Sequence, residues 1–590
     1  GLGDVYKRQG NVKGNEIIAD RLNIRTAGNT ETSRTAANIM NIKAGNIKAG
    51  VLEGSEMTLN ADRSITAGAI RSNNLKAVSQ KFESVSVEGQ NIELDVAGVL
   101  KNNGKILADT LSVKAGKIEN SEITAGRGSI TSSGDIEGGK IYSNDISIKG
   151  KNVRTDTVES GKTVIKADGE IRNAGKIVSK ELDMTAGRIE SGNIVSGSAV
   201  INADEINSGE ITSNELKVKG KNFTAVSKVD AESANFELKG KFTNRGTVSS
   251  DSLKVKAKDI SNDGKMYGSS AGLSSEGNTV NSGEIETGEL KVESAGLENR
   301  NSIKANRASV TTAGDTVNNG TVSVNDMTVK ARNTVNIGKM EADKLNITSS
   351  QATDNRGVIS ANELTVSTHG FTNSKEISAG KGTINAVGTV RNDDRINSNE
   401  LMVNAGEIVN SRKIETGKGT FTSAGDIVNN DIMIGNTLNF KGRNLVNGEG
   451  RTIFTTRELN AEMTGDIVNR KAELLSQGSM TLKAGTVDNT VGKIRGAGDV
   501  SITASRVENK GKAGDLTKYK VYWETWNGKK YNSWQELTDP NGGWQNSWSD
   551  WGNVLHQDSE SYIMTEGRSI YEAKKRNDWQ NGSYVLPSAQ

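Results

Sequence analysis

The side chains that could do chemistry here are mostly carboxylates, because histidine is scarce and cysteine is absent. The chain has two histidines, His369 and His556, far apart in the sequence, and it has no cysteine. It therefore has no thiol nucleophile and no disulfide framework, and it shows no nucleophile elbow, phosphate-binding loop or metal-ligand spacing. Aspartate and glutamate mostly alternate with lysine, which is typical of a solvated outer face. We expect His369, in a Thr-His-Gly turn, to be a solvated loop residue, and His556 to be structural. We also expect no enzyme activity, no metal site and no cofactor.

Aromatic residues gather at the C-terminal end. All seven tryptophans follow residue 514, where the composition changes. Aromatic faces stack on sugar rings and provide rigid contact area, so Trp544, Trp548 and Trp551 are candidate ligand contacts. The alternative, which we favour, is that the tryptophans form the core of a small β-rich module. Residues 514–590 are predicted to be a short, truncated, non-repeat segment rich in Trp and Tyr.

Asparagine recurs at one position of a regular repeat. In a series of twelve asparagines, the step in residue number from one to the next alternates between 18 and 19. They are Asn244, Asn262, Asn281, Asn299, Asn318, Asn336, Asn355, Asn373, Asn392, Asn410, Asn429 and Asn447. In stacked β structures, equivalent amides lie one above another and hydrogen-bond to each other. We predict that these residues form a structural ladder.

Aliphatic residues keep the same register. Leu or Met recurs at every thirty-seventh position from Leu216 to Leu438, and Val or Phe follows two positions later, as in Leu364 and Val366. One polar residue between two apolar residues is the alternation of a β-strand. The apolar runs are separated by Gly, Asn and Ser, which favour turns, and no amphipathic helix fits.

A coil of about 18–20 residues cannot bury its aliphatic residues alone, whereas stacked coils form a continuous core. We therefore predict an all-β protein in which residues 10–513 form a right-handed parallel β-helix (a solenoid), roughly 130 Å long at ~4.8 Å per coil. A hexapeptide β-helix fits poorly, because Ile359, Leu364 and Val366 are unevenly spaced. The glycine-rich motif of the calcium-binding nonapeptide roll is absent.

Charge and hydropathy argue against a nucleic-acid partner and against a transmembrane segment. The chain has 74 basic and 72 acidic residues, so it lacks the net positive charge of a nucleic-acid-binding protein. It has no run of 18 apolar residues, so we expect no transmembrane segment, and we find no signal peptide. Residues 1–9 do not fit the pattern that follows and are interpreted as an assembly scar. Both natural ends of the protein are expected to be missing.

Three segments resemble the repeats of filamentous haemagglutinin. They are residues 102–120 (NNGKILADTLSVKAGKIEN), 425–447 (GDIVNNDIMIGNTLNFKGRNLVN) and 476–511. They alternate N-x-G-x-I with L-x-V-x-A-G-x-I/V-x-N, and the resemblance covers most of residues 10–513. It implies a right-handed β-helix exported by two-partner secretion, with an outer-membrane transporter as partner. It also implies a location that is secreted or on the cell surface of a Gram-negative bacterium.

Members of this family act as adhesins or as stalks of contact-dependent growth-inhibition toxins. The expected function is therefore adhesion, and the expected partner is a receptor or glycan on host cells or on other bacteria. A toxin stalk is the second expectation. A glycan-cleaving β-helix enzyme is a third, which we disfavour because the coils between Asn244 and Asn447 keep a constant length and leave no room for active-site loops.

Overall fold

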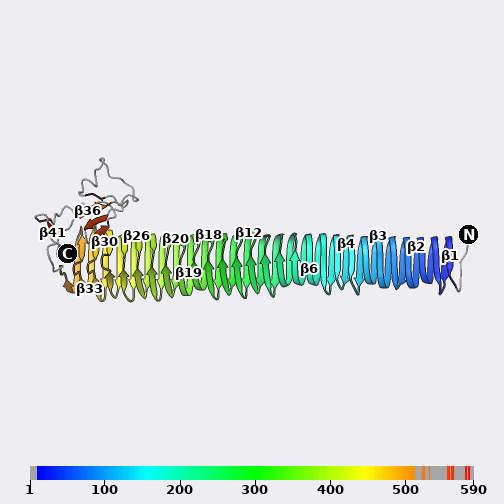
Figure 1. Ribbon diagram of the computed structural model, residues 1–590, viewed down its shortest axis with the longest axis horizontal. Coiled ribbons are helices and arrows are strands. Elements are labelled where there is room, and N and C mark those ends of the chain that lie inside the picture. The colour runs from blue at the N-terminus through cyan, green and yellow to red at the C-terminus, as the bar shows by residue number, and fades with distance from the viewer. Residues whose placement is uncertain are drawn as a thin grey trace. The chain divides into compact units, whose positions relative to one another are not determined.

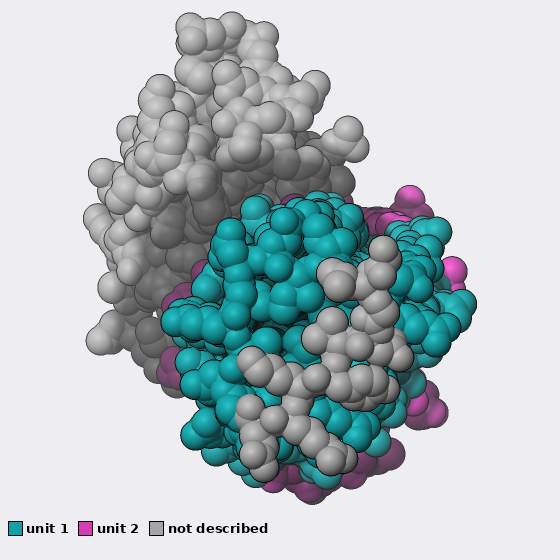
Figure 2. Space-filling view, turned by 90° about the vertical axis from the view of Figure 1, so that its right-hand side faces the viewer, with its two compact units in different colours: residues 1–294 teal, residues 295–590 magenta. Residues whose placement is uncertain are grey.

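Short alternating segments of this chain form strands that pair in parallel with the equivalent segment one coil later. The computed structural model describes residues 10–511 and six short strands between residues 521 and 584. No helix occurs among these described residues. Figure 1 shows successive coils as neighbouring arrows. The chain divides into two units, residues 1–294 and 295–590, which Figure 2 colours separately.

In unit 1 the strand conformation often continues around the corners of the coil. Strand β2 has 51 residues and β3 has 52, so each winds through more than one coil. The strands are β1 (Val12–Arg25), β2 (Asn29–Ser79), β3 (Lys81–Ser132), β4 (Ile136–Gly150), β5 (Val153–Ala167), β6 (Glu170–Ser208), β7 (Ile211–Ala225), β8 (Lys228–Leu238), β9 (Lys241–Asn244), β10 (Thr247–Ala257), β11 (Asp259–Asn262), β12 (Lys265–Ser275), β13 (Asn278–Asn281) and β14 (Glu284–Ser294).

In unit 2 most coils consist of one long strand and one short strand. They are β15 (Gly296–Asn299), β16 (Ser302–Thr312), β17 (Asp315–Asn318), β18 (Thr321–Asn336), β19 (Lys339–Asn355), β20 (Val358–Thr368), β21 (Gly370–Asn373), β22 (Glu376–Ala386), β23 (Thr389–Asn392), β24 (Arg395–Ala405), β25 (Glu407–Asn410), β26 (Lys413–Ser423), β27 (Ile427–Asn429), β28 (Ile432–Gly442), β29 (Leu445–Asn447), β30 (Thr452–Met463), β31 (Asp466–Val468), β32 (Glu473–Ser476), β33 (Ser479–Asp488), β34 (Lys493–Gly496) and β35 (Val500–Glu508).

The remaining strands pair in a different way. They are β36 (Val521–Glu524), β37 (Lys530–Tyr531), β38 (Val554–Gln557), β39 (Glu560–Ile563), β40 (Trp579–Gln580) and β41 (Ser583–Tyr584). Strand β36 pairs antiparallel with β37 and β38, and β38 pairs antiparallel with β39. This pairing contrasts with the parallel ladders of the coils.

Each coil turns its apolar residues inward. Val366, Ile384, Val403 and Phe421 occupy successive coils in register, and all four are buried. The same column in unit 1 holds Phe236, whose ring packs against Phe223 and Phe242 with ring centroids 4.7 and 5.0 Å away. Burial of the equivalent residue in every coil joins the coils of each unit into one continuous apolar core.

In parts of the core, large and small side chains alternate from coil to coil, so leucine returns in every second coil. Leu364 is aligned with Gly382 of the next coil, and Gly382 with Leu401 of the coil after it. In unit 1, Ala234 lies between Leu216 and Leu253 in the same way. In these stretches a leucine extends over the small residue of the neighbouring coil. The alternation breaks at Leu345, which is aligned with Met327 on one side and with Leu364 on the other.

The predicted all-β fold of stacked parallel coils is confirmed. Coil length varies more than the sequence pattern predicted. The step in residue number is 17 from Asn74 to Asn91, whereas it is 22 from Asn447 to Asn469. The longer coil contains a turn in which Gly450 has a φ of 71°, a conformation that glycine adopts without steric cost. The right-handed winding stays a prediction.

Candidate functional site

The asparagines that the sequence singles out are buried and hydrogen-bonded in series. In unit 2, each Nδ2 from Asn299 to Asn489 donates to the Oδ1 of the asparagine one coil later, over 2.8–3.0 Å. In unit 1, Asn244 donates to Asn262 and Asn262 to Asn281, both over 2.7 Å. The ladder residues from Asn244 to Asn447 are buried, so their amides bind neighbouring coils rather than a ligand.

The second N–H of each ladder amide also finds an acceptor. The Nδ2 of Asn355 donates to the backbone carbonyl of Glu376 over 3.1 Å, in addition to the Oδ1 of Asn373. Asn336 makes the equivalent pair of bonds to Asn355 and to the carbonyl of Val358. In Asn355 both donors and the acceptor of the buried amide are thus satisfied, and Asn336 and Asn355 each link their coil to the next at two points.

The ladder is interrupted in unit 1. Asn102 donates to Asn120 over 2.9 Å, but the next coil carries Gly138 at this position. Asn244 is aligned with Ala225, which is aligned in turn with Ser208. The Oδ1 of Asn244 and the Oγ of Ser208 have no hydrogen-bond partner among the described residues. These gaps explain why the asparagine spacing is irregular before residue 244.

Ion pairs join the coils on the outside. Glu53 lies between Arg34 and Arg71 of flanking coils, 2.9 Å from each guanidinium. Hydrogen bonds from Arg34 and Arg71 hold the pKa of Glu53 below its usual value. In unit 2, Asp426 accepts hydrogen bonds from Arg443 and Asn444, and the Arg443 bond lowers the pKa of this carboxyl most.

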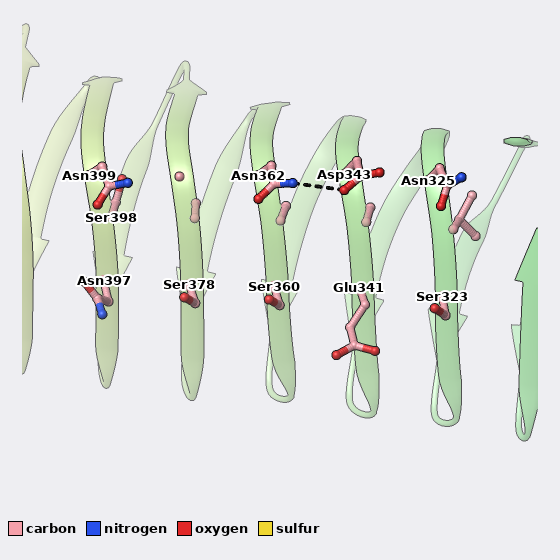
Figure 3. Close-up of a pocket in the computed structure, with 15 residues that line it drawn as sticks. Ser323, Asn325, Glu341, Asp343, Ser360, Asn362, Ser378, Asn397, Ser398 and Asn399 are labelled. Carbon is pink, nitrogen blue, oxygen red and sulfur yellow. Dashed lines mark hydrogen bonds between the residues drawn. The ribbon is translucent and has the colours of Figure 1, made fainter. Parts of the chain in front are cut away.

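A polar groove crosses five coils of unit 2. Its two rows of side chains are shown in Figure 3, one of Ser323, Glu341, Ser360, Ser378 and Asn397, the other of Asn325, Asp343, Asn362 and Asn399. The Nδ2 of Asn362 donates to Asp343 over 2.9 Å. The floor includes Ala361 and Ala379, whose small side chains leave the corner of the coil concave. Hydroxyls, amides and carboxylates at a ~4.8 Å spacing suit polar ligands with a repeat of their own.

A larger groove, of about 1150 Å³, lies on unit 1. Five lysines and four carboxylates line it: Lys219, Lys239, Lys254, Lys256 and Lys291, with Asp204, Glu237, Glu276 and Glu293. Lys219 lies 3.0 Å from the carboxylate of Glu237. The hydrogen bond from Lys219 lowers the pKa of Glu237, and the charge of Lys256 adds to this effect. We call this surface the lysine groove.

Of the other residues singled out in the sequence, the two histidines lie among the described residues and the three tryptophans do not. His369 is exposed in the turn between β20 and β21, beside a shallow hollow that Val387 and Asn404 also line. Trp544, Trp548 and Trp551 lie outside the described residues. His556 belongs to β38, which pairs with β36. No group of three or more His, Asp or Glu in the described part of the chain is arranged to hold a metal ion.

Comparison with known proteins gives no relative. No family model, curated protein or solved structure matches the chain. No helix among the described residues is long and apolar enough to cross a membrane.

Neither groove was predicted from the sequence. A signal for the lysine groove is nevertheless visible: LKVKGK begins at Leu216 and LKVKAK begins at Leu253, two coils later. Leu and Val of each segment point inward, so the lysines between and after them point outward. The concavity itself depends on how the coil bends at its corners, which the alternation of residues does not specify.

Proposed function

We propose that this chain is part of a secreted adhesin whose coils form an elongated scaffold that attaches the cell to host cells or other bacteria. The observation that carries the proposal is the unbroken asparagine ladder of unit 2, from Asn299 to Asn509. A scaffold that is hydrogen-bonded coil by coil keeps its surface in fixed register, so weak contacts repeat along it and add up.

The outer surface supports this proposal. The outward positions of the coils carry mostly hydroxyls, amides and charged groups, and they form concave grooves on both units. Such groups hydrogen-bond to the hydroxyls of glycans and to polar protein surfaces. The absence of cysteine also suits a chain that crosses an oxidising compartment before it folds, because no wrong disulfide can form. Export through an outer-membrane transporter and residence on a Gram-negative cell surface are parts of the same proposal.

A toxin stalk is the second candidate. A toxin stalk needs only a stable scaffold, so the asparagine ladder of unit 2 supports this function as well. The two functions differ in whether the coils and the segment after them bind a surface.

Adhesion of coated beads separates these functions. Beads carrying residues 10–590 and beads carrying residues 10–513 are compared on epithelial cells and on bacteria, with albumin-coated beads as the control. Binding by either protein above the control supports an adhesin, and loss of binding with the shorter protein places recognition in residues 514–590. If neither protein binds, the adhesin proposal fails and the toxin stalk gains support.

We also propose that the chain has no catalytic activity of its own. The described residues hold no clustered metal ligands, and their grooves are lined by side chains that repeat from coil to coil. Incubation with acidic polysaccharides, followed by absorbance of unsaturated sugars, tests this proposal. Time-dependent product above the boiled-protein control would contradict it.

A further inference from the structure

In the lysine groove, lysines recur at regular intervals along the coils. Stacking of the coils does not require this regularity. Lys219 and Lys256 occupy the same column, two coils apart, with Glu237 between them. Lys254 and Lys291 occupy a second column, two coils apart, with Gly272 between them. Because neighbouring coils are ~4.8 Å apart, positive charges repeat along each column at roughly 10 Å.

Three of these lysines form no ion pair with a described residue, and the charge of Lys256 acts on Glu237 without direct contact. Lys239, Lys254 and Lys256 are exposed and form no ion pair within the described part of the chain. An ammonium group that is free in the resting structure can pair with an external anion without first breaking an internal bond. These three lysines are therefore the ones that a negatively charged ligand would engage.

The shape of the groove points to a linear ligand. Its lining residues run from Thr185 to Glu293 and so follow the coils along unit 1. At Gly272 the floor is open, because the nearest heavy atom to an added Cβ would be the carbonyl oxygen of Leu253, 3.9 Å away. A flat membrane surface would make little use of such a hollow, whereas an extended polymer would lie in it.

The other lining groups indicate how densely charged that polymer is. Glu237 lies between two lysines of one column, and Glu276 and Glu293 also line the groove. These carboxylates repel an anionic polymer more strongly the more charges each of its units carries. Asn202 and Asn235 supply amide groups that suit hydroxyls, and Leu238 supplies apolar surface. This mixture suits a chain of sugars that each carry no more than a single carboxylate.

We propose that the lysine groove binds a linear, non-sulfated polysaccharide that contains uronate residues, with its carboxylates paired to Lys239, Lys254 and Lys256. This inference deepens the proposed function, because it names a ligand class for the adhesive surface. It rests on that proposal only for its biological role, since binding of the polysaccharide can be measured without cells.

The test uses the full chain with three immobilised probes: polygalacturonate, heparin as a densely sulfated chain, and dextran as a neutral chain. Biolayer interferometry at low and high salt measures the affinity for each. We expect polygalacturonate to bind, dextran not to bind, and heparin to bind more weakly than polygalacturonate. Tighter binding of heparin would contradict the proposed charge spacing, and no binding of polygalacturonate would overturn the site.

Variants locate the binding. Lys239→Gln with Lys254→Gln and Lys256→Gln should weaken polygalacturonate binding roughly tenfold, since each exposed pair contributes a fraction of a kcal/mol. The matched control is Lys140→Gln with Lys176→Gln and Lys180→Gln, which removes three exposed lysines of unit 1 outside the groove. The control should change the affinity less than twofold. Equal losses in the two variants would show non-specific attraction and contradict the site.

A steric variant keeps every charge in place. Gly272→Tyr adds a side chain that suits a β-strand at the open part of the floor. We expect it to reduce polygalacturonate binding at least as much as the lysine variant, with an unchanged circular dichroism spectrum. Undiminished binding would contradict a ligand that lies in the groove. If the polysaccharide binds but the coated beads do not adhere, the inference stands and the adhesin proposal fails; the reverse result rejects only the inference.

Discussion

A Cβ atom added to Gly419 would lie 2.7 Å from the Cδ2 atom of Leu438 in the next coil. The two residues are aligned in the parallel pairing of β26 with β28. At this level of the core, the side chain of Leu438 therefore occupies space that Gly419 leaves open. The alternation of large and small residues is local, because Leu345 is aligned with Leu364 and Leu438 with Leu459.

Gly419→Ala tests the fit between Gly419 and Leu438. The added methyl group overpacks the column and should destabilise the surrounding coils by about 1–3 kcal/mol. In a Leu438→Ala background the cost should fall in part, because the Cδ2 atom of Leu438 is gone while the Cε2 atom of Phe421 remains 2.6 Å from the added Cβ. The difference between the two costs measures the coupling between Gly419 and Leu438. Hydrogen exchange of residues 413–442 provides the readout. Equal costs in both backgrounds would show that the two side chains do not share space.

The asparagine ladder gives a second prediction. Asn355→Ala removes the acceptor of Asn336 and the donor to Asn373, both of which are buried. Each buried polar group left without a partner costs about 1–3 kcal/mol, so local protection from exchange should fall by roughly 2–5 kcal/mol. Asn362→Ala is the control, because Asn362 is exposed and makes one surface hydrogen bond, to Asp343. If the two variants lose similar protection, the ladder does not stabilise the coils.

The gap at Ala225 gives a prediction of opposite sign. An asparagine at this position would place a donor beside the unpaired Oδ1 of Asn244 and an acceptor beside the unpaired Oγ of Ser208. Ala225→Asn should therefore stabilise the coils around it by about 1 kcal/mol, the usual net value of a hydrogen bond. Thermal unfolding followed by circular dichroism measures the change. A lower unfolding temperature would show that the column has no room for the amide.

Asp426 should make stability depend on pH. Its folded pKa lies below the unfolded value, so the folded state favours the carboxylate. The resulting stabilisation is complete above the unfolded pKa of about 4 and is lost as the pH falls through the folded pKa. The difference in urea midpoint between the unsubstituted protein and Asp426→Asn should therefore be present at pH 7 and close in strong acid. A difference in urea midpoint that persists or widens in strong acid would contradict a lowered pKa of Asp426 in the folded state.

Structural features that depend on residues close in sequence, or on residues repeated at a constant interval, could be predicted from the sequence. The asparagine steps predicted stacking because a buried amide needs a partner, and the simplest partner is the same residue one coil later. The alternation of Leu364 with Val366 predicted strands because it reflects only the period of the backbone. These features follow from residues that are close in sequence, or that repeat at a constant interval.

Other features depend on neighbours that the pattern did not identify. Gly382 reads as a turn residue in sequence, yet it lies in the middle of β22 because Leu401 occupies the space beside it. The sequence also did not reveal that Ala225 interrupts a ladder, since alanine is common in apolar columns. The lysine groove depends on coil curvature, and the predicted contacts Trp544, Trp548 and Trp551 fall outside the described residues.

In-register stacking of coils is the central claim, and cysteine cross-linking tests it most directly, because the chain contains no cysteine. Thr365 and Thr383 are aligned in adjacent coils, whereas Thr365 and Met402 lie two coils apart. Adjacent strands place Cα atoms at ~4.8 Å, within the range of a disulfide, and two coils place them at roughly 10 Å, beyond it. We expect Thr365→Cys with Thr383→Cys to form a disulfide on mild oxidation, as seen by mass spectrometry of unreduced peptides. We expect no disulfide between Thr365→Cys and Met402→Cys. A disulfide in the second pair and none in the first would contradict the stacked coils.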